Sequence, residues 1–152
     1  MQSLNDIALK EVGYKEGANN ANKYSAALKK PAESWCADFV VWCAIQAGQG
    51  DVIEHSSYCP DFETWAYKNN LVVQKSMIQP NDLLLFDWTN KGIAEHIGIS
   101  LGYNKTTHQI DTVEGNTGSG TAGNQSNGDG VYKRSRDLSL IRLVIRPKWK
   151  TT

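Results

Sequence analysis

The chain has 152 residues, 40% of them hydrophobic, which is enough to bury the core of one domain. Sixteen basic residues balance sixteen acidic ones, which argues against a strongly basic nucleic-acid-binding protein and against a polybasic membrane anchor. No apolar run approaches the ~18 residues of a membrane helix, and residues 1–13 lack the pattern of a secretory signal. We therefore expect one soluble, monomeric domain over 1–152, without membrane insertion or a nucleic-acid partner, in which 147–152 is either a frayed tail or the start of a linker.

The first half of the chain has apolar residues at helical spacing. This spacing predicts helices over 4–12, around 22–28, from 34 to a stop at Gly48, and from Pro60 to 69–70. Ser3 and Asp6 have the spacing of a capping box at the first of these. The third helix is the most apolar, so we expect it to be mostly buried.

Beyond Pro80 the apolar pattern has a period of two, which is typical of strands. The predicted strands are 83–88, 95–103, 108–115 and 140–146. Helices followed by an antiparallel sheet indicate the α+β class. The glycine-rich segment 115–130 is expected to be a mobile loop at the rim of a cleft.

Cys36 lies in the first turn of the buried helix, with Ser34 as the expected N-cap. The positive end of the helix dipole favours the thiolate, so Cys36 is a candidate nucleophile; the alternative is a small buried hydrophobe. Cys43 is about 10 Å further along the helix, too far for a disulfide with Cys36, and is expected in the core. Cys59 stays unassigned: it either caps the next helix or meets Cys43.

A cysteine nucleophile needs a base, and His96 is the candidate because it shares a strand face with Gly98, which we expect to leave room for substrate backbone. A structural histidine is the competing interpretation. The group that orients the ring should accept a hydrogen bond from its other nitrogen. Glu114 and Asn116 point to the same side of their strand and are both candidates. Glu114 is the first choice, because a carboxylate stabilises imidazolium better than an amide does.

Five segments in this order resemble the CHAP family, the cysteine, histidine-dependent amidohydrolases/peptidases. They are SWCADFVVWCAIQAG from Ser34, PNDLLLF from Pro80, EHIGIS from Glu95, VEGNTG from Val113 and GDGVYKRSR from Gly128. The resemblance spans roughly residues 4–146 and is strongest to the catalytic module of a bacteriophage endolysin. It implies a papain-like fold and hydrolysis of an amide bond in bacterial peptidoglycan. The implied roles are Cys36 as nucleophile, His96 as base, and Glu114 or Asn116 as the orienting group.

The resemblance leaves several points open. Many relatives bind calcium through an acidic loop near the N-terminus, but residues 13–24 hold one carboxylate, Glu16, so we expect no metal and no cofactor. Trp35 and Trp88 are the candidate substrate-binding aromatics. Both a muramoyl-alanine amidase and a cross-bridge or stem endopeptidase fit these residues. The alternatives are an inert papain-like binding or virion-structural module and a secreted bacterial amidase effector. The missing signal favours an enzyme made in the host cytoplasm that reaches the wall during phage lysis.

Overall fold

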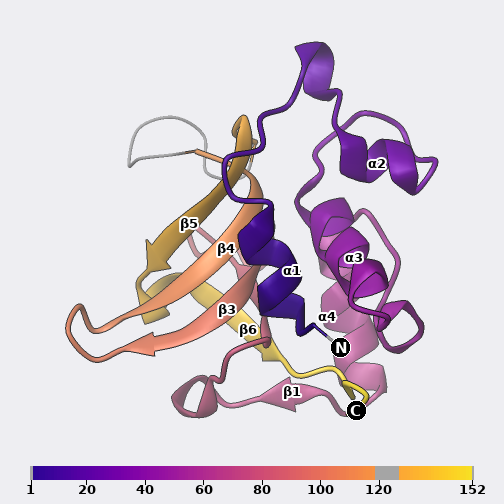
Figure 1. The fold of residues 1–152 in the computed structure, drawn as a ribbon. Coiled ribbons are helices and arrows are strands. Elements are labelled where there is room, and N and C mark those ends of the chain that lie inside the picture. The colour runs from indigo at the N-terminus through magenta and orange to yellow at the C-terminus, as the bar shows by residue number, and fades with distance from the viewer. Residues whose placement is uncertain (1, 119–126, 152) are drawn as a thin grey trace.

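The computed structural model describes residues 2–118 and 127–151. Helices come first in the chain and strands last, and Figure 1 shows the helices gathered on one side of the sheet. This is the α+β arrangement that the sequence predicts. Packing of a central helix on an antiparallel sheet agrees with a papain-like fold.

The helices of the described residues lie near their predicted ranges. They are α1 (Leu4–Lys10), α2 (Lys23–Ala27), α3 (Cys36–Gln46) and α4 (Cys59–Lys68), with 3-10 turns at Ala18–Asn20, Gly50–Val52, Lys75–Met77 and Leu138–Leu140. The predicted capping box is confirmed at α1: Ser3 Oγ accepts from the Asp6 backbone N–H, and the Asp6 carboxylate accepts from the Ser3 backbone N–H, both at 3.1 Å. Pro60 lies in the first turn of α4, as expected.

The described strands form one antiparallel sheet with the order β1-β6-β2-β3-β4-β5. They are β1 (Val72–Val73), β2 (Leu83–Phe86), β3 (His96–Asn104), β4 (Gln109–Thr117), β5 (Gly130–Arg136) and β6 (Ile141–Ile145). The sequence analysis missed β1, which has two residues, and β5, whose run of polar residues hides the alternation. The predicted loop 115–130 is shorter than expected, because Thr117 pairs with Gly130. Its central part, 119–126, lies outside the described residues.

Helix α3 is the centre of the fold. Its side chains Phe39, Val40 and Cys43 are fully buried. The helix packs on β3 and β4 on one side and contacts α1 and α2 as well. Cys43 is therefore a core residue, as predicted. Packing on several sides fixes the first residue of α3 relative to the strands, which matters for the site described below.

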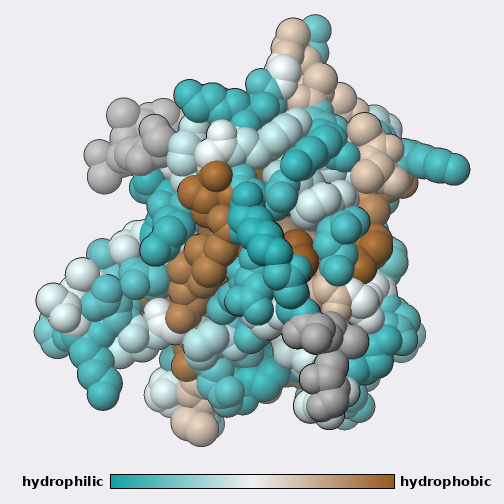
Figure 2. Space-filling model, viewed as in Figure 1, coloured by the Kyte–Doolittle hydropathy of each residue, from teal (hydrophilic) through white to brown (hydrophobic). Residues whose placement is uncertain are grey.

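The surface is mostly polar. Figure 2 shows a hydrophobic strip alongside α1 on a face that is otherwise largely hydrophilic, and Leu9 and Val12 are among the exposed apolar residues. Single exposed apolar side chains are ordinary on a folded domain. Across 2–118 and 127–151, no helix has both the length and the apolar character needed to cross a membrane.

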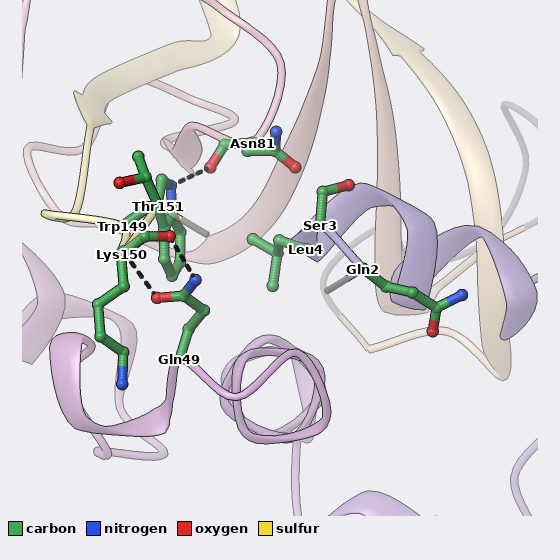
Figure 3. Close-up of a pocket in the computed structure, with 8 residues that line it drawn as sticks. All are labelled: Gln2, Ser3, Leu4, Gln49, Asn81, Trp149, Lys150 and Thr151. Atoms are coloured by element: carbon green, nitrogen blue, oxygen red, sulfur yellow. Dashed lines mark hydrogen bonds between the residues drawn. The ribbon is translucent and has the colours of Figure 1, made fainter.

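Trp149 and Lys150, near the end of the described residues, lie against the domain. Trp149 Nε1 donates to the Asn81 carbonyl at 3.1 Å, and Lys150 exchanges two backbone hydrogen bonds with the Gln49 side chain at 2.9 Å. Figure 3 shows these contacts beside the start of α1, around a hollow of about 350 Å³. This hollow contains none of the candidate catalytic residues.

Candidate active site

Cys36 is the first residue of α3, as the sequence predicts. The N-cap, however, is Trp35 and not Ser34, and no side chain caps this helix end. The expected Ser34 cap is therefore wrong. Uncapped backbone N–H groups at a helix start favour negative charge, so the position suits a thiolate even without the serine.

The Cys36 side chain reaches a groove on the surface. Its exposed fraction is only 4%, but it lines a hollow of about 350 Å³. The other lining residues are Ser34, Ser57, Tyr58, Cys59, Pro60, Ile93, Ala94, Glu95 and Asn127. Cys36 thus lies at the bottom of an open groove and is nearly covered by its neighbours.

His96, the first residue of β3, is fully buried beside this groove. Its Nε2 is 2.9 Å from Glu114 Oε1. The other ring nitrogen, Nδ1, has no hydrogen-bond partner among the described residues, and the His96 ring lies close enough to the Cys36 thiol for the two groups to shift each other's pKa. The structure therefore brings together the three groups that the sequence analysis proposed: thiol, imidazole and carboxylate.

The protonation states of these groups depend on one another. The hydrogen-bond contact with the Cys59 thiol lowers the pKa of Cys36 well below its ordinary value, and His96 and the Ile97 backbone act in the same direction against burial. Burial alone would lower the pKa of His96, but the Cys36 thiolate and Glu114 outweigh it and raise this pKa to about 9. The favoured pair near neutral pH is therefore thiolate and imidazolium.

Glu114 is held in place by partners on both sides. Burial opposes its charge, yet Arg136 and His96 lower its pKa to about 2. Thr112 Oγ1 also donates to Oε2 at 2.6 Å. Glu114 is thus a fixed anion that keeps the His96 ring in one orientation.

Arg136 is the functional residue that sequence reasoning missed. Its Nε donates to Glu114 Oε2 at 2.8 Å and its Nη2 to Oε1 at 2.6 Å. Its guanidinium also lies 4.7 Å from the Trp88 ring. The segment GDGVYKRSR contains this arginine, but nothing in the spacing indicates a partner 22 residues away.

Asn116, the second candidate for orienting His96, has a different place. It is buried with a φ of 55°, and its Nδ2 donates to Asn127 Oδ1 at 3.3 Å. The group that accepts the hydrogen bond from His96 Nε2 is Glu114 Oε1 instead. Of the two alternatives, the geometry favours the carboxylate.

The two candidate substrate-binding tryptophans differ. Trp35 is fully buried, stacks on Tyr24 and donates from Nε1 to Glu16 at 3.0 Å. Its position in the core contradicts the expectation that it contacts substrate. Trp88 is half-buried, with its ring 5.6 Å from that of His96, and it stays a candidate.

Gly98 has another role than expected. A Cβ at this position would lie 2.7 Å from Glu114 Cγ. The missing side chain therefore leaves room for Glu114 to reach His96, and not for substrate backbone. Gly98 is part of the packing around His96 and Glu114 and does not line the groove.

Cys59 is next to Cys36 and not next to Cys43. The Sγ atoms of Cys36 and Cys59 are 3.6 Å apart, and both thiols are free. Both expectations for Cys59 were wrong, since the N-cap of α4 is Tyr58. A cysteine beside a proline carries no sequence signal for such a contact.

Within the part of the chain that the structure describes, no group of three His, Cys, Asp or Glu residues could hold a metal ion. Glu16, the single carboxylate of 13–24, accepts the indole N–H of Trp35.

Comparison with known proteins agrees with these observations. The model of a family described as the CHAP domain matches residues 28–116, more than half of the chain. The chain belongs to the CHAP family. CHAP domains are in general hydrolases that act as peptidoglycan amidases or peptidases, and the matched range contains Cys36, His96 and Glu114. No curated protein and no solved structure matches the chain.

Proposed function

We propose that this CHAP domain is a peptidoglycan hydrolase that uses Cys36 as a nucleophile to cleave an amide bond. The observation that carries the proposal is the hydrogen bond between His96 and Glu114, beside a helix-start cysteine at the bottom of a groove. A buried imidazole with a carboxylate behind it and a thiol in front is the arrangement that nucleophilic acyl transfer needs.

The geometry supports a two-step mechanism. The Cys36 thiolate attacks the amide carbonyl, and the backbone N–H of Cys36 at the start of α3 is placed to stabilise the oxyanion. His96 protonates the leaving amine through Nδ1, which gives a thioester. A water molecule deprotonated by His96 then hydrolyses the thioester and regenerates the thiolate. Glu114 stabilises the imidazolium throughout.

The groove suits a segment of a polymer. It is open to solvent, and Tyr58 and Ile93 on its rim are 58% and 41% exposed. Exposed apolar side chains beside the hydroxyl and amide groups of Ser34, Ser57 and Asn127 can bind both sugar and peptide parts of a wall fragment. The substrate bond is therefore either the muramoyl-alanine amide or a peptide bond of the stem or cross-bridge. We propose the endolysin role for the protein: it acts on the bacterial wall after release from the host cytoplasm.

The test is lysis of purified cell walls by the wild-type protein, Cys36→Ala and Cys43→Ala. We expect wild type and Cys43→Ala to clear the walls and Cys36→Ala to be inactive, because Cys43 is a core residue away from the groove. Mass spectrometry of the released muropeptides identifies the cleaved bond. Activity retained in Cys36→Ala, or no lysis by any of the proteins, would contradict the proposal.

A further inference from the structure

Two buried cysteines meet below the groove. The Sγ atoms of Cys36 and Cys59 are 3.6 Å apart, a hydrogen-bond contact between sulfurs and much longer than the ~2.05 Å of a disulfide. Each cysteine is the first residue of a helix, α3 and α4 respectively. The starts of two helices therefore converge on one pair of thiols, of which the proposed mechanism uses only Cys36.

The groups around Cys36 favour a negative charge on its sulfur. His96 approaches it from β3 with a ring that carries a positive charge near neutral pH. The Ile97 backbone N–H also faces this sulfur. Since both groups stabilise an anion, Cys36 is the member of the pair that loses its proton.

The groups around Cys59 disfavour a charge there. Asp38, on α3, is buried, and the hydroxyls of Ser25 and Ser57 donate to its carboxylate at 2.7 and 2.6 Å. The Cys36 sulfur, burial and Asp38 all raise the pKa of Cys59. Other charged groups in this region are Lys30, 3.8 Å from Asp38, Asp61 in the first turn of α4, and Glu95 at the edge of the groove. Both cysteines start helices, so the helix dipoles do not determine which thiol loses its proton. The difference comes from His96, which favours a charge on Cys36, and from Asp38, which disfavours a charge on Cys59.

We propose that Cys59 is a positioning residue for the nucleophile: its thiol keeps its proton and donates an S–H hydrogen bond to the Cys36 thiolate. This bond stabilises the reactive form of Cys36 and restricts its sulfur to one position beside His96. The inference rests on Cys36 being the nucleophile of the proposed function. It adds a third side chain, from α4, to the His96 and Glu114 pair.

The pH dependence of Cys36 alkylation tests this role. Reaction with iodoacetamide, located by peptide mapping, is measured against pH in wild type, Cys59→Ala and Cys59→Ser, with Cys43→Ala as the control. Cys59→Ala removes a hydrogen bond to a charged group. It should therefore raise the pH midpoint of Cys36 alkylation by about one unit or more. Cys59→Ser keeps a donor, so its midpoint should stay close to that of wild type. Cys43→Ala should not shift it.

Two outcomes would overturn the proposal. If neither Cys59 variant shifts the midpoint, Cys59 has no influence on the nucleophile. If alanine and serine shift it equally, the effect comes from packing and not from a donated proton. Circular dichroism confirms that each variant is folded.

A measurement on the wild-type protein keeps the proposal testable if Cys59→Ala does not fold. Limited alkylation near neutral pH should label Cys36 well before Cys59, and labelling of Cys59 first would overturn the assignment. Neither experiment requires turnover. A protein that shows these shifts but does not cleave cell walls would refute the proposed function and leave the interaction between the two thiols intact.

Discussion

Arg136 and His96 share one carboxylate oxygen. Glu114 Oε1 lies 2.6 Å from Arg136 Nη2 and 2.9 Å from His96 Nε2, while Oε2 accepts from Arg136 Nε at 2.8 Å. A bidentate arginine fixes the plane of a carboxylate. The orientation of the imidazole therefore depends on a residue of β5 that does not touch the thiol.

Replacing Arg136 with glutamine should destabilise the protein strongly. The substitution leaves a buried carboxylate without its main counter-charge, which typically costs about 3–5 kcal/mol. Arg142→Gln is the matched control, because Arg142 makes a similar bidentate contact with Glu63 at the surface and should cost about 1 kcal/mol or less. Urea unfolding compares the two. If both variants lose the same free energy of unfolding, burial of the Arg136–Glu114 pair does not determine its contribution.

The pH dependence of stability should show a plateau. In the native state the Cys36 thiolate and the His96 imidazolium together hold one proton. In the unfolded chain between pH 6.5 and 9, the histidine is neutral and the thiol is protonated, so the pair again holds one proton. These two groups therefore give no slope there. Below pH 6.5 the unfolded pair holds two protons, so stability falls. Urea midpoints across pH test this, and a steady decline from pH 6.5 to about 8, below the range where the unfolded thiols of Cys43 and Cys59 lose their protons, would show that the native pair holds more than one proton.

Glu114 adds a separate loss in acid. Its pKa is about 2 in the folded protein against an ordinary 4.5, so its contribution is complete above pH 4.5 and disappears as pH falls toward 2. Glu114→Gln should remove this part of the acid dependence while lowering stability at neutral pH. Urea midpoints of the variant between pH 2 and 5 provide the test. An acid dependence identical to that of wild type would contradict the assignment.

The orienting group can be identified by a pair of variants. Glu114→Gln should reduce wall-cleaving activity by about 10²–10⁴-fold, because a neutral amide does not stabilise imidazolium. Asn116→Gly preserves the left-handed backbone at φ 55° and removes the amide, so its activity should stay within a few-fold of wild type. The initial rate of wall clearing at equal protein concentration measures both. The reverse order would assign the role to Asn116.

Adding a methyl group at Gly98 should disturb the same network. Its Cβ would lie 2.7 Å from Glu114 Cγ and 3.3 Å from Phe86 Cε2, so Gly98→Ala should cost about 1–3 kcal/mol and most of the activity. Gly17→Ala is the control: a Cβ there meets nothing closer than 3.5 Å at a φ of −88°, so the variant should be neutral or slightly stabilising. Thermal melting and wall clearing check both variants. A Gly98→Ala protein as stable and active as wild type would show that Glu114 can move aside.

Local sequence signals located most of the elements and the three central groups. Helical spacing and a capping box depend on neighbouring residues, so α1 and α3 could be predicted from the chain alone. Alternation placed His96 and Glu114 on strands, and a cysteine at a helix start has a recognisable chemistry. These features are all set within a few residues of sequence.

The features that were missed depend on distant partners. Arg136 lies in a strand of mostly polar residues. Its partner, Glu114, is on the neighbouring strand β4, so the role of the arginine becomes visible only once the two strands are paired. Cys59 contacts Cys36 because two helices converge, which no spacing indicates. Gly98 was assigned to the substrate because the position of Glu114 on the neighbouring strand was unknown. The burial of Trp35 was also missed, because it comes from packing against Tyr24, which lies eleven residues earlier in the chain.

The position of β6 also has a consequence for biosynthesis. Residues 141–145 are inserted between β1 and β2, so β1 lacks its partner and β2, which already pairs with β3, lacks the neighbour on its other side until this segment leaves the ribosome. Before then, the backbone groups of Leu83–Phe86 are exposed on the side that β6 later covers, and such unpaired edges favour association with other chains. Nascent protein should therefore depend on chaperones until residues 141–145 have emerged, and a hydrolase directed at the wall would become active only after that point.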